Sequence, residues 1–149
     1  MDEEIFAYII SKLKDSYSEP LPEMVLKRLV EFGYELKEVD AWPIYFAMQK
    51  VEHHIKNQCN ITSIPDGLMH IAVDMVCGEF LSVKKQTGQL EFDAVNLDGA
   101  IKKVQEGDIT VEFATSTSSS NEGSSFDKFI DYLIYGKESE LVCYRKLMW

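Results

Sequence analysis

The stretch from Asp40 to Phe80 constrains the fold most, because it has the pattern of two long helices joined by a turn. Its first half carries apolar side chains three and four residues apart, on one helical face: Ala41, Ile44, Tyr45, Met48, Val51, Ile55 and Cys59. The second half is apolar on two faces: Leu68, Ile71, Ala72, Met75, Val76 and Phe80 on one, and Met69, Val73 and Cys77 on the other. Such a helix needs more than one packing partner. In a chain of 149 residues, another subunit is one candidate for the second partner.

Helix-terminating residues frame both halves of this pair. We expect Asp40 to cap the first helix at its N-terminus and Asn60 to end it. Ser63 and Asp66 resemble a capping box with Asp in place of the usual Glu, and Pro65 suits the first turn of a helix. The second helix is therefore predicted to start near Ser63.

Three further segments have the period of amphipathic helices. Residues 2–15 and a stretch from Pro22 to Gly33 precede the central pair, and Phe126–Tyr135 follows it, ending at Gly136. The short links between the first four helices predict a mainly α fold. We expect a small helical bundle of about four to five helices, with a helical core at about residues 2–82.

After this helical core, the residue pattern is no longer that of amphipathic helices. Residues 99–114 are predicted to form one β-hairpin, with a turn at Glu106-Gly107-Asp108 and an alternating arm from Ile109 to Phe113. A lone hairpin is marginal in water, so this one needs a partner surface. The Ser- and Thr-rich residues 115–125 are expected to be a mobile loop, either a plain linker or a segment that orders against a partner. We expect one domain spanning residues 1–149.

The C-terminal helix and tail occupy residues 126–149, and the tail ends in aromatic and basic side chains. Chain ends are usually polar, whereas Trp, Tyr, Arg and Met are enriched at protein interfaces. An extended C-terminal tail that docks on a partner is therefore predicted. The candidate partner-binding residues are Phe126, Phe129, Tyr144, Arg145, Lys146, Leu147, Met148 and Trp149. In the alternative, Trp149 folds back onto the core of its own subunit, and the two arrangements are compatible.

The composition limits the function classes. A net charge of −10 and a pI of about 4.7 argue against a protein that wraps phosphate backbones, but they suit a surface past which DNA slides. Three cysteines, an odd number, favour reduced thiols over a disulfide framework. The acidic N-terminus does not resemble a signal peptide, and no apolar run reaches the roughly 20 residues of a membrane span. We expect a cytosol-like compartment and no membrane.

Chemical sites are weakly supported. His70 and Asp74 lie four residues apart on a predicted helix and, with Cys59, could hold a metal, but the spacing matches no zinc motif. Cys59 or Cys143 as a nucleophile would need a nearby His and an orienting group, which the sequence does not indicate. No GxSxG, HExxH or P-loop pattern is present. We predict no enzyme activity, no cofactor and no metal site.

Several pieces of the chain, taken in order, resemble a known family. They are the stretch from Asn60 to Phe80 with Ile64-Pro65 at its start, the Gly107-Asp108 turn after Ile101-Lys102-Lys103-Val104, and the Ser-rich gap. The chain then ends on Phe126-Asp127, Tyr135-Gly136, Leu141 and Tyr144-Arg145-Lys146-Leu147-Met148-Trp149. From about Ala41 to Trp149, this order is similar to that of the head–tail connector (adaptor) proteins of long-tailed bacteriophages.

The resemblance implies a structural virion protein without catalytic chemistry. Members of the family form a ring, typically a dodecamer, beneath the portal protein at one vertex of the phage head. The ring extends the DNA channel and receives the stopper or tail-completion protein. DNA would pass through the lumen without sequence-specific binding. The chain would reside at the neck of the virion, and in the host bacterial cytoplasm before assembly. The alternative is a small helical interaction adaptor or assembly chaperone that forms no ring.

Overall fold

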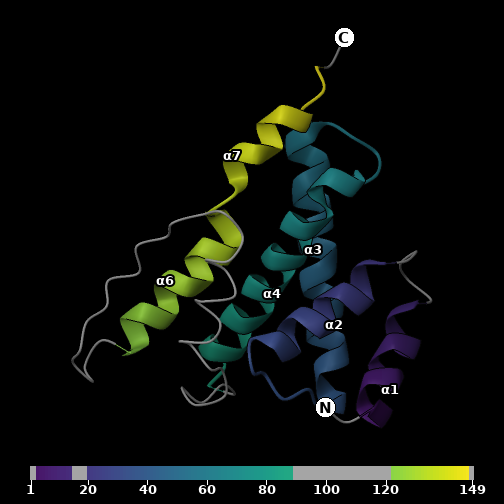
Figure 1. Cartoon of the computed structure of the whole chain (residues 1–149), viewed down its shortest axis with the longest axis vertical. Coiled ribbons are helices and arrows are strands. Elements are labelled where there is room, and N and C mark those ends of the chain that lie inside the picture. Colours follow the sequence, from purple (N-terminus) through teal and green to yellow (C-terminus); the bar gives the residue numbers. More distant parts are fainter. Residues whose placement is uncertain (1–2, 15–19, 89–121, 148–149) are drawn as a thin grey trace.

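The computed structural model describes residues 3–14, 20–88 and 122–147, which form a helical bundle around one central helix (Figure 1). The helices are α1 (Glu3–Lys14), α2 (Leu21–Glu31), α3 (Ala41–Cys59), α4 (Met69–Gln86), α6 (Glu122–Tyr135) and α7 (Glu138–Leu141). Three short 3-10 turns accompany them: η1 (Glu38–Asp40), η2 (Asp66–Leu68) and η5 (Val142–Tyr144). The predicted mainly helical fold is confirmed for these residues. The predicted hairpin at residues 99–114 lies outside them, as do residues 115–121 of the predicted loop.

The central helix is α4, which contacts α2, α3 and α6. Its side chains are buried almost all the way round, including Ile71, Val73, Cys77 and Phe80. Both apolar faces read from the sequence are therefore covered by helices of the same chain. A second subunit is not needed to cover the second face, contrary to one expectation above, because α6 returns across α4 from a distant part of the sequence.

Gly78 allows α6 to lie close against α4. A Cβ atom at this position would lie 2.8 Å from a side-chain carbon of Ile134 and 2.9 Å from the Cβ of Leu133. Beyond this contact, Phe129 of α6 packs edge-to-face on Phe32, which follows α2, with ring centroids 5.2 Å apart. The glycine thus lets one helix join the two halves of the core.

Most helix ends follow the predicted signals. Gly33, the second residue after α2, has a φ of 88°, and Asn60, directly after α3, has a φ of 54°, so both helices end at a residue in the left-handed region. The predicted start of the second central helix near Ser63 is wrong. Pro65 is extended, with a ψ of 152°, and the 3-10 turn η2 leads into α4 only at Met69.

Two other boundaries also differ from the sequence prediction. The helix α4 continues to Gln86, four residues beyond the predicted core, and ends with Lys84 and Lys85 in its last turn. Cations are favourable there because the carbonyl end of a helix carries partial negative charge. The helix α6 begins at Glu122 rather than at Phe126, within the segment expected to be a loop.

The helix α3 defines the two ends of the molecule. Its 19 residues correspond to a length of about 28 Å at 1.5 Å per residue. In Figure 1 it runs from the end where α1 lies to the end where α7 and the C-terminus lie. Features near Ala41 and features near Cys59 are therefore at opposite ends of the molecule.

Candidate functional site

An exposed cluster of aromatic and apolar side chains lies where α3 begins. We call it the Trp42 surface, and it consists of Tyr8, Val39, Trp42, Tyr45 and Phe46. Val39 is 71% exposed, Trp42 65% and Phe46 54%. The Trp42 ring stacks on Tyr45 with centroids 5.4 Å apart and meets Phe46 edge-on at 4.8 Å. Aromatic side chains that pack on each other while remaining open to solvent are typical of protein-binding surfaces.

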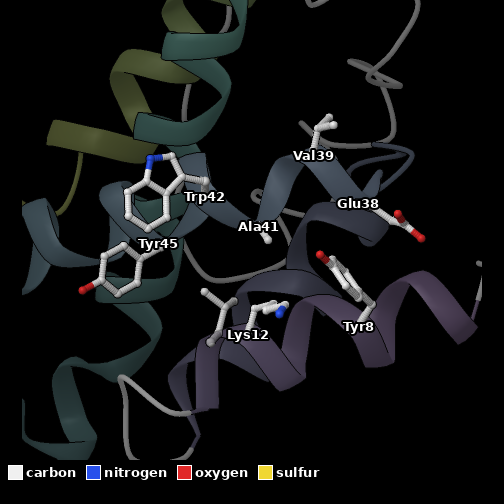
Figure 2. Close-up of a pocket in the computed structure, with 8 residues that line it drawn as sticks. Tyr8, Lys12, Glu38, Val39, Ala41, Trp42 and Tyr45 are labelled. Atoms are coloured by element: carbon white, nitrogen blue, oxygen red, sulfur yellow. The ribbon is translucent and has the colours of Figure 1, made fainter.

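A pocket of about 430 Å³ opens beside these rings, between α1, η1 and α3. Figure 2 shows Tyr8 and Lys12 coming from α1, Glu38 and Val39 from η1, and Trp42 and Tyr45 from α3. The Lys12 ammonium lies 5.5 Å from the centre of the Tyr8 ring. Among the described residues, the pocket thus combines aromatic walls with one cation and one anion. Its volume falls within the range of known ligand pockets.

A buried polar network holds η1 in place beneath this surface. The Asp40 carboxylate is fully buried, and one oxygen accepts hydrogen bonds from the Tyr34 hydroxyl and the Lys37 backbone N–H, both at 2.9 Å. The other oxygen pairs with the Lys84 ammonium of α4 at 2.6 Å. Burial, together with the charge of Asp40 and its hydrogen bond, raises the pKa of Tyr34, so this hydroxyl stays protonated and donates. Asp40 occupies the predicted N-cap position of α3, but its side chain serves this network instead of capping the helix.

The C-terminal segment, residues 142–147, lies at the opposite end of α3. The Lys146 backbone N–H donates to the Cys59 carbonyl at 2.8 Å, and the Asn60 side-chain amide donates to the Lys146 carbonyl at 3.4 Å. The Tyr144 hydroxyl lies over Gly67, where a Cβ atom would be only 2.0 Å away. These contacts tie the segment to the end of α3 and to η2 as far as Lys146.

The helix α7, which leads into this segment, is also tied to α3. His54 Nε2 lies 2.9 Å from the Glu138 carboxylate, and the Cys59 thiol donates to the Leu141 carbonyl at 3.3 Å. The chain is therefore tied to α3 along α7, up to the predicted docking tail of Tyr144 to Trp149. The backbone is helical as far as Tyr144, and only from Arg145 is it extended.

The structure separates the predicted partner-binding residues into two groups. Phe126 and Phe129 are buried in the core. Tyr144, Arg145, Lys146 and Leu147 are exposed. Leu147 is 72% exposed, directly after the residue that is held at Cys59. Met148 and Trp149 lie outside the described residues, so whether Trp149 folds back stays open, and the docking role of the tail stays a prediction.

The residues considered for a metal site do not form one. Asp74 of α4 accepts from Arg28 Nε at 2.9 Å and lies 3.9 Å from the Lys137 ammonium, while His70 is exposed. Cys59 is fully buried, and its thiol donates to the Leu141 carbonyl. Within the described residues, no group of three His, Cys, Asp or Glu side chains could hold a metal ion.

The charged side chains around Asp74 form ion pairs with one another. Burial alone would lower the pKa of the Arg28 guanidinium, but the carboxylates of Asp74 and Glu31 outweigh it, and the pKa is raised.

Burial raises the pKa of the Cys59 thiol and, more strongly, that of Cys77. These thiols are held protonated, which makes them poor nucleophiles.

The Trp42 surface was not predicted from the sequence, although a signal for it exists. Trp42 and Phe46 are four residues apart on α3 and fall outside the buried stripe of that helix. Two large aromatic residues at this spacing share a face. Because the rest of α3 already supplies a complete core face, an aromatic pair away from it indicates a second surface.

Comparisons with known proteins give no match for this chain, whether with protein-family models, with curated proteins or with solved structures. None of the helices among the described residues has the length and apolar character needed to cross a membrane.

Proposed function

We propose that this protein is a structural subunit of a phage virion that forms a ring beneath the portal and joins the head to the tail. The observation that supports this function best is the exposed Trp42 surface at one end of α3, with the exposed C-terminal segment at the other. A subunit with separate contact surfaces at two ends is suited to linking neighbours in an assembly. Rings are built from such unlike surfaces when the rotation between copies closes.

The charge of the chain also fits this role. A net charge of −10 gives a lumen surface little attraction for phosphate backbones, so DNA would pass without being held. The portal protein is the proposed partner on the head side, and the stopper or tail-completion protein on the tail side. A dodecameric ring at the neck of the virion is the proposed assembled state.

Mass photometry of the purified chain mixed with portal rings from the same source tests the proposal. We expect the portal mass to increase by multiples of the 17.1 kDa subunit mass that approach the symmetry of the portal. If the chain stays unbound and instead joins a single soluble partner without forming a ring, the connector proposal fails and the adaptor or chaperone function takes its place.

A further inference from the structure

We propose that the Trp42 surface of one copy binds the C-terminal segment of a second copy, with Leu147 as the apolar anchor. This inference rests on the proposed function, since it names the contact that would join neighbouring subunits of the ring. The Trp42 surface and the C-terminal segment, at the two ends of α3, would then each have a partner in a second copy of the chain.

The anchor cannot come from the same molecule. The Lys146 backbone N–H is bonded to the Cys59 carbonyl, so Leu147 is held at the C-terminal end of α3. Trp42 is at the N-terminal end, about 25 Å away along the helix. The pocket beside Trp42 can therefore receive Leu147 only from another copy.

The two surfaces are complementary in chemistry. The pocket offers aromatic walls from Tyr8, Trp42 and Tyr45 to an aliphatic side chain, and the C-terminal segment presents Leu147 to solvent. The segment also carries two adjacent cations, Arg145 and Lys146. The exposed Glu38 carboxylate on the pocket wall can pair with one of them, and the Trp42 face can accept the other. Lys12, the cation of the pocket, lies beside Tyr8.

The size of the surface predicts a weak contact that gains strength by repetition. Its exposed side chains offer roughly 400 Å² of apolar area, which lies within the range of a functional surface patch. A stable pair of proteins buries about 800 Å² on each partner, so one contact alone would be transient. Because the contact joins unlike surfaces, each copy can both give and receive a segment, and a closed ring repeats it at every subunit.

Cysteine cross-linking tests the contact directly. Two proteins are prepared in a Cys143→Ser background, one with Val39→Cys and one with Lys146→Cys, which keeps the Leu147 anchor, while Cys59 and Cys77 stay buried. They are mixed under mild oxidation, free in solution and on portal rings, and the products are separated without reductant. We expect a cross-linked pair of one Val39→Cys chain and one Lys146→Cys chain. Adding Trp42→Ala to the Val39→Cys chain should lower the yield of the cross-linked pair by about tenfold or more.

A matched control and two outcomes decide the inference. Tyr135→Cys, which places the thiol at a similarly exposed position outside the Trp42 surface, should cross-link poorly with Lys146→Cys. Equal yields for Tyr135→Cys and Val39→Cys, or a predominance of Val39→Cys pairs with themselves, overturn the inference. Portal binding without the mixed cross-link leaves the proposed function standing and this contact refuted. A mixed cross-link without portal binding supports this contact and refutes the proposed function.

Discussion

At the scale of single residues, Asp40 and Lys84 hold η1, which carries Val39 of the Trp42 surface. Both side chains are almost completely buried, and their ion pair links η1 to the last turn of α4. A buried ion pair is weak evidence of net stability, because both charges lose their hydration. Removing one partner, however, leaves the other buried and uncompensated. The ion pair therefore fixes the position of η1 relative to the last turn of α4.

We predict that Lys84→Met destabilises the protein by about 3–5 kcal/mol, because it leaves the Asp40 carboxylate buried without its cation. Urea unfolding followed by circular dichroism measures the loss. Lys27→Met is the matched control, since Lys27 pairs with Glu23 on the surface of α2, and it should cost less than about 1 kcal/mol. Similar losses for the two variants would show that the buried pair has no special role.

At the scale of elements, hydrophobic periodicity could predict which segments are helical but not how they cover one another. The stripes around Ile9, Leu29 and Met48 mark the buried faces of α1, α2 and α3 correctly. The all-round burial of α4 depends on α6 returning over Gly78, a contact between residues more than 50 positions apart. Helical spacing holds no information about such a contact.

The candidate site was partly predictable for a related reason. Composition pointed to the C-terminal tail, and Tyr144 to Leu147 are indeed exposed. The same reasoning included Phe126 and Phe129, which the structure places in the core. From the sequence, an aromatic residue on an amphipathic helix that faces the core cannot be told from one that faces a partner. The Trp42 surface depends on α1 lying beside the start of α3, which the sequence does not specify.

The attachment of the C-terminal segment gives a prediction at the same scale. In Gly67→Ala, the added methyl group would collide with the Tyr144 hydroxyl, so the ring must leave and the segment should loosen. Amide hydrogen exchange at Lys146, whose N–H is bonded to the Cys59 carbonyl, should then become faster.

Tyr144→Ala provides the comparison for this prediction. It should accelerate exchange at Lys146 by a similar factor, and the double variant Gly67→Ala/Tyr144→Ala should exchange no faster than Tyr144→Ala alone, because both changes act on one contact. Unchanged protection of Lys146 in Gly67→Ala would mean that the Tyr144 ring does not hold the segment.

At the scale of the whole molecule, the end of the chain is predicted to matter for assembly and not for folding. Deleting Met148 and Trp149 should leave helix content unchanged, because the described helices end before them. Incorporation into portal-containing particles should be lost, as an aromatic anchor often dominates a contact. Circular dichroism and sedimentation of assembled particles measure the two effects. Incorporation of the shortened chain at the normal level would contradict the docking role of the tail.

The bond between the Lys146 N–H and the Cys59 carbonyl has a geometric consequence. Under the proposed contact, α3 becomes a rigid spacer between the point where a copy gives its segment and the point where it receives one. The repeat distance around an assembly is then set by the length of this helix, and the curvature by the angle at which the segment leaves it. The number of copies in a closed ring would follow from the rotation that this contact sets between neighbours, and this rotation has to match the symmetry of the portal on which the ring is built.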